Sequence, residues 1–161
     1  MGQNVAQKLI GSHLADGEMT AGSEIGLRID QTLTQDATGT MVMLELEALG
    51  LDRVRTQASV QYVDHNLLQA DERNMADHLF LRSACQRFGV WYSRPGNGVS
   101  HPVHMQRFGR PGASLAGSDS HTCAAGSQNT NQRVRKISAG LVQGRITAAE
   151  LRPSHGRGHP G

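Results

Sequence analysis

Apolar positions along the chain switch between the spacing of helices and the alternation of strands. Residues 5–14 carry apolar side chains at helical spacing and predict a helix that ends near Gly17. Residues 25–29 alternate apolar side chains with polar or small ones, which predicts a strand. The same criteria predict further helices at 37–49, 74–88 and 101–108, and strands at 60–63, 90–92 and 113–116. Helices that alternate with strands in this way are typical of a layered α/β domain.

Residues with capping preferences mark the ends of these helices. Asp36 precedes the helix 37–49 and is expected to be its N-cap, and Gly50 is expected to end it. Gly89 is expected to end the helix that starts at Asn74. Most of the polar motifs described below follow predicted strands, and open α/β sheets bind ligands beyond the carboxyl ends of their strands.

The last part of the chain differs in composition from the rest. Residues 1–124 hold ten Lys or Arg and thirteen Asp or Glu (net −3), whereas residues 125–161 hold six Lys or Arg and only Glu150 (net +5). No aromatic residue follows Phe108. We therefore predict one domain over residues 1–126 and a divergent, basic, disordered tail over residues 127–161. Because no aromatic residues are interleaved with its charges, we expect no nucleic-acid partner.

Composition also limits the compartment in which the protein works. The apolar fraction is 37% and the mean hydropathy is −0.42. No apolar run is long enough to span a bilayer, so we expect no membrane segment. The N-terminus lacks the basic and apolar regions of a signal peptide, which predicts a cytoplasmic protein. The two cysteines, Cys85 and Cys123, fit a reducing compartment.

A carboxylate, a hydroxyl and an imidazole occur on the consecutive residues Asp119, Ser120 and His121, after a predicted strand. Neighbouring side chains of a strand point to opposite faces, so only a turn can gather all three around one ligand. Together they offer an anion, a neutral donor and acceptor, and a group that titrates near neutral pH. The alternative is a polar turn in which Asp119 caps the following segment.

The other histidines allow more than one interpretation. Asp64 and His65 follow the strand 60–63 and form either a proton-transfer pair or a surface ion pair. His101 and His104 could share one helix face and bind zinc, although no third ligand is obvious nearby. Two further histidines are expected to be ordinary helix residues: His13 and His78.

Four sequence blocks are highly specific when they are taken together and in order. They are residues 35–40 (Gln-Asp-Ala-Thr-Gly-Thr), 62–66 (Tyr-Val-Asp-His-Asn), 94–98 (Arg-Pro-Gly-Asn-Gly) with His101, and 117–122 (Gly-Ser-Asp-Ser-His-Thr). Over residues 1–126 the chain resembles the N-terminal part of the iron–sulfur hydro-lyases, the family of aconitase and of the 3-isopropylmalate dehydratase large subunit. The resemblance implies an incomplete three-layer α/β/α domain of the aconitase type.

The resemblance also implies an activity, which is the reversible conversion of citrate to isocitrate through cis-aconitate on a [4Fe-4S] cluster. In it His65 serves the substrate hydroxyl with Asp64 beside it, and His101 pairs with Asp119. The block at residues 35–40 favours aconitase over 3-isopropylmalate or homoaconitate-type dehydratases. The implied catalytic residues are Asp64, His65, His101, Asp119 and His121, and the implied substrate-binding residues are Gln35, Asp119, Ser120 and His121.

The resemblance does not extend to the cluster ligands of the family. A [4Fe-4S] cluster needs about three or four protein thiolates, and neither Cys85 nor Cys123 matches a ligand position. The base serine of the family also lies beyond the resemblance. We therefore expect a truncated hydro-lyase that binds no metal and is inactive alone, with a tricarboxylate as its substrate in the intact enzyme. A second chain would carry the missing domains. The alternative is a non-catalytic remnant or a partner-binding fragment.

Overall fold

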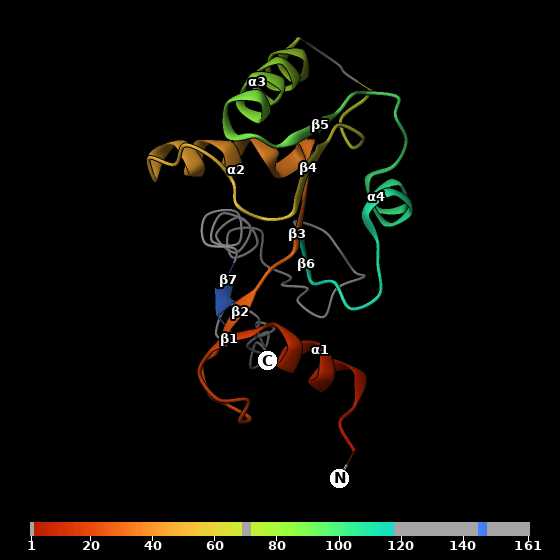
Figure 1. Ribbon diagram of the computed structural model, residues 1–161. Coiled ribbons are helices and arrows are strands. Elements are labelled where there is room, and N and C mark those ends of the chain that lie inside the picture. Colours follow the sequence, from red (N-terminus) through yellow and green to blue (C-terminus); the bar gives the residue numbers. More distant parts are fainter. Residues whose placement is uncertain (1, 69–71, 118–144, 148–161) are drawn as a thin grey trace, which may run out of the picture.

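The computed structural model describes residues 2–68, 72–117 and 145–147 (Figure 1). Strands and helices alternate through most of this part of the chain, as the sequence predicts. In order the elements are α1 (Val5–His13), β1 (Leu14–Asp16), β2 (Gly26–Arg28), β3 (Gln31–Gln35), α2 (Asp36–Ala48), β4 (Ala58–Tyr62), α3 (Arg73–Phe88), β5 (Trp91–Ser93), α4 (Ser100–Phe108), β6 (Leu115–Gly117) and β7 (Arg145–Thr147).

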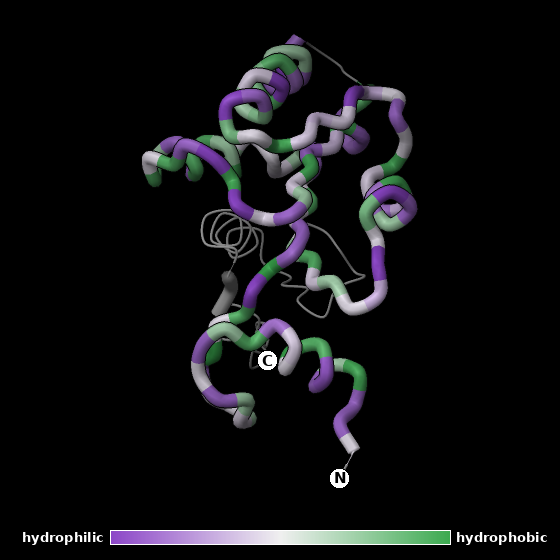
Figure 2. The backbone as a smooth tube through the Cα atoms, in the orientation of Figure 1, coloured by the Kyte–Doolittle hydropathy of each residue, from purple (hydrophilic) through white to green (hydrophobic). Residues whose placement is uncertain are grey.

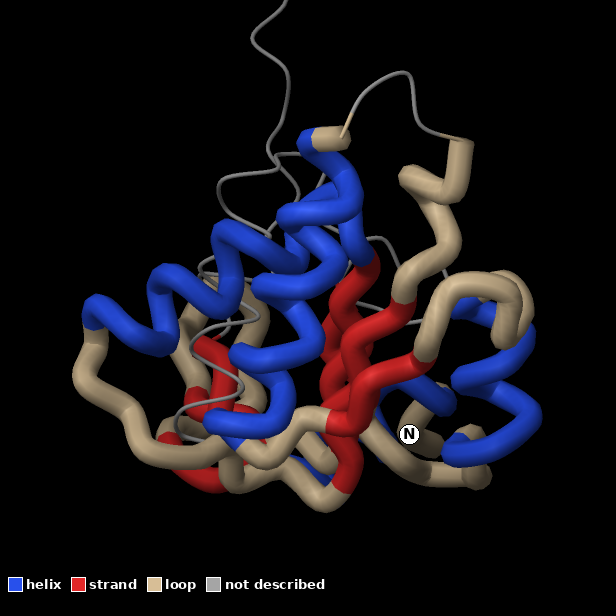
Figure 3. Tube along the Cα trace, turned by 90° about the horizontal axis from the view of Figure 1, so that it is seen from above, coloured by secondary structure: helices blue, strands red, loops and turns tan. Residues whose placement is uncertain are grey.

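The main sheet has four parallel strands in the order β5-β4-β3-β6. In the view from above, α2 and α3 lie on one side of these strands and α4 lies on the other (Figure 3). The chain therefore winds from β3 to β5 over one face and returns to β6, beside β3, over the opposite face. This arrangement confirms the predicted α/β class with helices on both faces of the sheet, as in an incomplete aconitase-type domain.

Two apolar clusters hold the layers together. Hydrophobic and hydrophilic residues are mixed along α3 (Figure 2), whose buried residues include Leu81, Cys85 and Phe88. The cluster between α2 and α3 includes Val42, Met43, Leu46, Leu81, Cys85 and Phe88. The cluster between the sheet and α4 includes Leu33, Val60, Tyr62 and Leu115, with Val103 and Phe108 packed against it.

Polar side chains cover the sheet face that is turned towards α2. Thr32 donates from Oγ1 to Oγ of Ser59 (2.8 Å), and Thr34 donates from Oγ1 to Oε1 of Gln61 (2.6 Å). These four side chains are buried, and the hydrogen bonds offset much of the cost of removing them from water. The central strand β3 escapes prediction because four of its five residues are polar.

Several predicted boundaries differ from the observed ones. The first helix ends at His13 rather than near Gly17, because the backbone is already extended at Leu14. Asp36 is the first residue of α2 and not its N-cap; Gln35 is the N-cap, and its side chain accepts from the Ala37 N–H. Gly89 ends α3 in the left-handed conformation (φ 73°), as its position predicts.

A second, antiparallel sheet joins the two ends of the chain in the order β1-β2-β7. Its outer strand β7 lies within the segment 127–161, for which the sequence predicts disorder, and it pairs with β2 in the register Leu27↔Ile146. The other residues of that segment lie outside the described part of the chain. Among the helices that the structure describes, none combines the length and apolarity needed to cross a bilayer.

Candidate functional site

The candidate site lies at the carboxyl edge of the parallel sheet. Strands β3, β4 and β6 end there at Gln35, Tyr62 and Gly117. Between β3 and β6 the winding reverses, because α2 follows β3 on one face and α4 precedes β6 on the other. The strand ends at such a reversal are the usual ligand site of an open α/β sheet.

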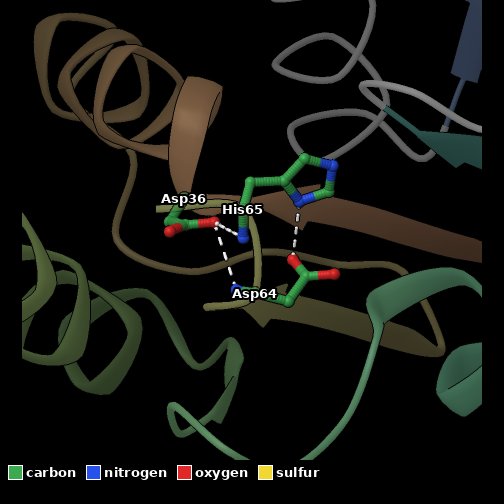
Figure 4. A group of neighbouring side chains, drawn as sticks. All are labelled: Asp36, Asp64 and His65. Atoms are coloured by element: carbon green, nitrogen blue, oxygen red, sulfur yellow. Dashed lines mark hydrogen bonds and ion pairs between the residues drawn. The ribbon is translucent and has the colours of Figure 1, made fainter. Parts of the chain in front are cut away.

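Asp64 and His65 follow β4 and form a hydrogen-bonded pair. Nδ1 of His65 lies 2.8 Å from Oδ1 of Asp64, and the other ring nitrogen points away from the carboxylate (Figure 4). The Asp64 side chain is only 5% exposed, whereas that of His65 is 32% exposed. Because a carboxylate can only accept, Nδ1 carries the proton and Nε2 is left for a ligand.

His101, in the first turn of α4, faces the same pair. Its ring centroid lies 6.5 Å from that of His65, and the two rings meet edge to face at 78°. The N-terminus of α4 is fixed there, because Ser100 donates its backbone N–H to Oδ2 of Asp64 (2.6 Å). The structure therefore brings together residues of two separate sequence blocks: the adjacent Asp64 and His65, and His101.

His104 does not join this group. It is fully buried, with Nδ1 3.1 Å from the Tyr62 hydroxyl and Nε2 3.1 Å from Oε1 of Gln31. Burial, helped by the nearby His101, lowers the pKa of His104 to about 4. Both ring nitrogens have partners within the core, so the interpretation of His101 and His104 as a zinc pair is wrong.

Gln35 lies at the same sheet edge and is only 5% exposed. Its Oε1 accepts from the Ala37 N–H at 2.6 Å, as described for the N-cap of α2. The three remaining predicted site residues lie outside the described residues: Asp119, Ser120 and His121. The strand that precedes them, β6, ends beside β3 at the edge described above.

Two buried histidine–carboxylate pairs were not predicted. Nε2 of His13 lies 2.8 Å from Oδ2 of Asp30, and Nε2 of His78 lies 3.3 Å from Oδ2 of Asp36. Both histidines were interpreted as ordinary helix residues. Their partners are 17 and 42 residues away in the sequence, and no local spacing connects them.

Three potential metal-ligating atoms lie close together in this region. Asp36, Asp64 and His65 each offer one atom, and these atoms lie within 4.8 Å of one another. However, both carboxylate oxygens of Asp36 accept backbone N–H groups of residues 64–66. Asp64 is likewise occupied by His65 and by the Ser100 N–H. The carboxylate oxygens of this group therefore already hold the loop and the N-terminus of α4.

Iron–sulfur ligation can be tested on Cys85, the cysteine among the described residues. Its side chain packs in the apolar cluster between α2 and α3 and is 1% exposed. Burial raises the pKa of the Cys85 thiol to about 12, which favours the thiol over the thiolate that a cluster needs. Buried among apolar side chains, Cys85 does not fit a cluster ligand, and Cys123 lies outside the described residues.

Comparison with known proteins identifies the family. The sequence profile of the Aconitase family (aconitate hydratase) matches residues 7–129, which is most of the chain. The chain belongs to the aconitase family. The match extends over all four blocks named above and ends three residues after the boundary expected from the sequence.

Members of the aconitase family with two different names are similar to the chain. The 3-isopropylmalate dehydratase large subunit 1 of Thermotoga maritima is 29% identical over 126 residues, which are 78% of this chain and 30% of that protein. The mitochondrial aconitate hydratase of Candida albicans is 34% identical over 135 residues, with 75% of this chain and 17% of that protein covered. The chain thus spans less than a third of the length of either relative.

Proposed function

We propose that this chain supplies the proton-transfer residues of a hydro-lyase site that converts citrate to isocitrate through cis-aconitate. The observation that supports the proposal is the meeting of Asp64, His65 and His101 at the carboxyl edge of the sheet. A half-exposed imidazole oriented by a buried carboxylate is a common form of general acid and base. The family assignment supports hydro-lyase chemistry, and the choice of citrate is part of the proposal.

In this proposal His65 serves the substrate hydroxyl. Dehydration removes a hydroxyl from one carbon and a proton from its neighbour, so the hydroxyl must gain a proton to leave as water. Asp64 accepts a hydrogen bond from Nδ1–H of His65 and thereby turns Nε2 towards the ligand; the doubly protonated ring then gives its Nε2 proton to the leaving hydroxyl. Rehydration reverses the step, and Nε2 then accepts the proton of the incoming water.

The remaining predicted residues complete the substrate site in the proposal. Gln35 lies at the end of β3, and Asp119, Ser120 and His121 follow the neighbouring strand β6 in the sequence. We assign substrate contact to these four residues, and a pairing with His101 to Asp119. The strand order supports this assignment, because β3 and β6 flank the point where the winding reverses.

A [4Fe-4S] cluster supplies a Lewis acid for the substrate hydroxyl and carboxylate in aconitase-type enzymes. The described residues do not fit such a cluster, since the Cys85 thiol is buried among apolar side chains. Our proposal therefore assigns the cluster and the carbon base to domains or a second chain outside this sequence. The 161-residue chain alone is expected to bind a tricarboxylate weakly and to leave it unchanged.

A second candidate substrate is 3-isopropylmalate. It is favoured by the relatives from Thermotoga maritima and Elusimicrobium minutum, named as 3-isopropylmalate dehydratase large subunits, which match 78% of this chain. The two substrates differ in a way that a binding experiment can resolve: citrate carries three carboxylates, whereas 3-isopropylmalate replaces one with an apolar branch.

Binding of each substrate to the labelled 161-residue chain tests this proposal. We expect citrate and cis-aconitate to shift the ring signals of His65 and His101 in NMR spectra, and 3-isopropylmalate to shift them less. In the variant His65→Gln, the affinity for citrate that is read from the His101 signal should fall about tenfold. In the control His159→Gln in the tail, this affinity should stay unchanged. Citrate that leaves both rings unshifted, or that shifts signals only elsewhere, would contradict the proposal.

A further inference from the structure

The loop that carries the catalytic pair is held by a carboxylate from a different element. Oδ1 of Asp36 accepts the backbone N–H groups of Asp64 (3.2 Å) and His65 (2.9 Å), and Oδ2 accepts that of Asn66 (2.8 Å). Three consecutive peptide groups thus converge on one side chain, as Figure 4 shows for the first two. A single carboxylate fixes the path of the whole turn.

Asp36 does not serve its own helix in the way its position predicts. It opens α2, but the Ala37 N–H of that helix is already bonded by the N-cap Gln35. The Asp36 side chain is instead fully buried, with 0% exposure, and points into the loop after β4. Its carboxylate is therefore available for residues 64–66, about 30 positions further along the chain.

Asp36 keeps its charge in this buried place. Burial by itself would raise the pKa of Asp36, but the N–H groups of His65, Asn66 and Asp64 outweigh it and hold the pKa below the ordinary value. An ionised carboxylate makes stronger hydrogen bonds to peptide N–H groups than a neutral acceptor does. The anion is therefore the form that orders the loop.

A third element supports the carboxylate from behind. Nε2 of His78, in α3, lies 3.3 Å from Oδ2 of Asp36. The Tyr92 hydroxyl of β5 in turn donates to the carbonyl oxygen of His78 (3.2 Å). Asp36, on α2, is thus held by His78 of α3, and His78 is in turn held by Tyr92 of β5.

The position of the loop in turn determines the positions of Asp64 and His65. Asp64, whose N–H is held by Asp36, bonds His65 through Oδ1 and the Ser100 N–H through Oδ2. The direction of the His65 ring and the position of the α4 N-terminus therefore both depend on where the loop is held. A displaced loop would separate His65 from His101.

We propose that Asp36 is a positioning residue, which sets the geometry of Asp64, His65 and His101 through the backbone of residues 64–66. The catalytic meaning of this role rests on the proposed function, but the geometric part does not. The contacts of the Asp36 carboxylate are with backbone N–H groups of residues 64–66 and with His78. Asp36 acts by ordering the loop that carries Asp64 and His65.

The variant Asp36→Asn tests the inference, with Asp30→Asn as a matched control. Both aspartates are buried, pair with Nε2 of a histidine and accept backbone N–H groups. Asparagine keeps the shape but replaces one accepting oxygen with an NH2 group that can only donate. Asp30 holds Ser114 and not the loop, so its loss destabilises the fold without acting on residues 64–66.

We expect the amide protons of Asp64, His65 and Asn66 to exchange about tenfold faster or more in Asp36→Asn. The nuclear Overhauser effect between the ring protons of His65 and His101 should be lost at the same time. In Asp30→Asn both should stay as in the unmodified chain, even if the chain unfolds at a lower denaturant concentration. A general loss of stability would affect both variants alike.

Unchanged exchange and an unchanged ring contact in Asp36→Asn would overturn the inference, and so would equal losses in the control. Should Asp36→Asn fail to fold, the unmodified chain still decides: scalar couplings across the hydrogen bonds should join the three amide nitrogens to Cγ of Asp36, and their absence would overturn it. None of these measurements uses a substrate. A correct loop geometry without a response to citrate would contradict the proposed function alone.

Discussion

His104 is a histidine whose surroundings disfavour its charged form. It lies between the Tyr62 hydroxyl and the Gln31 side chain and is fully buried. No carboxylate contacts it, in contrast to His13 and His78, and its pKa is lowered to about 4 by burial. The fold therefore requires neutral His104.

This requirement makes stability depend on pH. Between pH 6.5 and about 4 the unfolded chain binds a proton on His104 and the folded chain does not, so acid favours unfolding. The free energy of unfolding should fall by up to about 3 kcal/mol over that interval because of this residue. Urea denaturation at a series of pH values should show a smaller fall for His104→Gln.

The aspartates with lowered pKa values do not interfere with this measurement. Asp30 and Asp36 hold stabilising charges above the ordinary value of 3.8 and lose them only as the pH falls further. The variant His159→Gln in the tail serves as the control and should follow the unmodified chain. An equal pH dependence for His104→Gln would show that His104 is protonated in the folded state.

Sequence reasoning located Asp64 and His65 at a strand end and missed the contacts that Asp36 makes with their loop. Asp64 and His65 are adjacent, and their position after an apolar run predicts their place at a strand end. The role of Asp36 is different, because the groups that it binds are about 30 residues away. A capping preference is a local signal, and it predicted the wrong partner for a carboxylate that bonds across the sheet edge.

At the scale of elements, α2 packs closely against β4 at Gly39. A Cβ atom built on Gly39 would lie 2.2 Å from Oε1 of Gln61. The Gln61 side chain cannot move aside freely, because it bonds Thr34 and the carbonyl oxygen of Tyr62. Glycine at this position lets the helix lie directly on the polar face of the sheet.

Replacing this glycine should therefore destabilise the protein. Although alanine favours a helix over glycine, we expect Gly39→Ala to lower the free energy of unfolding by about 1–3 kcal/mol through overpacking. Gly11 in α1 has nothing within 4 Å of its built Cβ atom and provides the control. Gly11→Ala should raise stability by about 0.5–1 kcal/mol, as measured by urea denaturation. A stabilising Gly39→Ala would mean that α2 packs less closely.

The elements that sequence reasoning recovered are those with an apolar side. Strand β4 and helices α2 and α3 contribute buried apolar residues to the two clusters, α4 contributes partly buried ones, and their patterns are visible in the sequence. Strand β3 is buried on both faces, but it satisfies Thr32 and Thr34 through side chains of β4. Such pairing depends on the neighbouring strand and leaves no pattern in β3 itself.

At the scale of the whole molecule, one surface combines a large cavity with exposed apolar side chains. The cavity has a volume of about 490 Å³ and is lined by Leu67, Met75 and Leu79, among others. Met75 and Leu79 are 55% and 59% exposed. Apolar surface of this kind favours association in water.

We predict that the isolated chain self-associates through this surface. Sedimentation velocity should show a sedimentation coefficient that rises with concentration, and the double variant Met75→Lys, Leu79→Lys should suppress the rise. Val5→Lys, at an 83% exposed position in α1, is the control and should have no effect. A chain that stays monomeric at every concentration would contradict the prediction.

The return of the chain from β5 to β6 has a consequence for biosynthesis. Gln31 of β3 pairs with Leu115 of β6, which lies 84 residues later in the chain. This pairing can form only after β6 has left the ribosome. Pairings at such separation form slowly, whereas β3, α2, β4 and α3 are close in sequence and can assemble earlier. The part of the site with Asp64 and His65 is therefore expected to form first, and β6 is expected to join the sheet last.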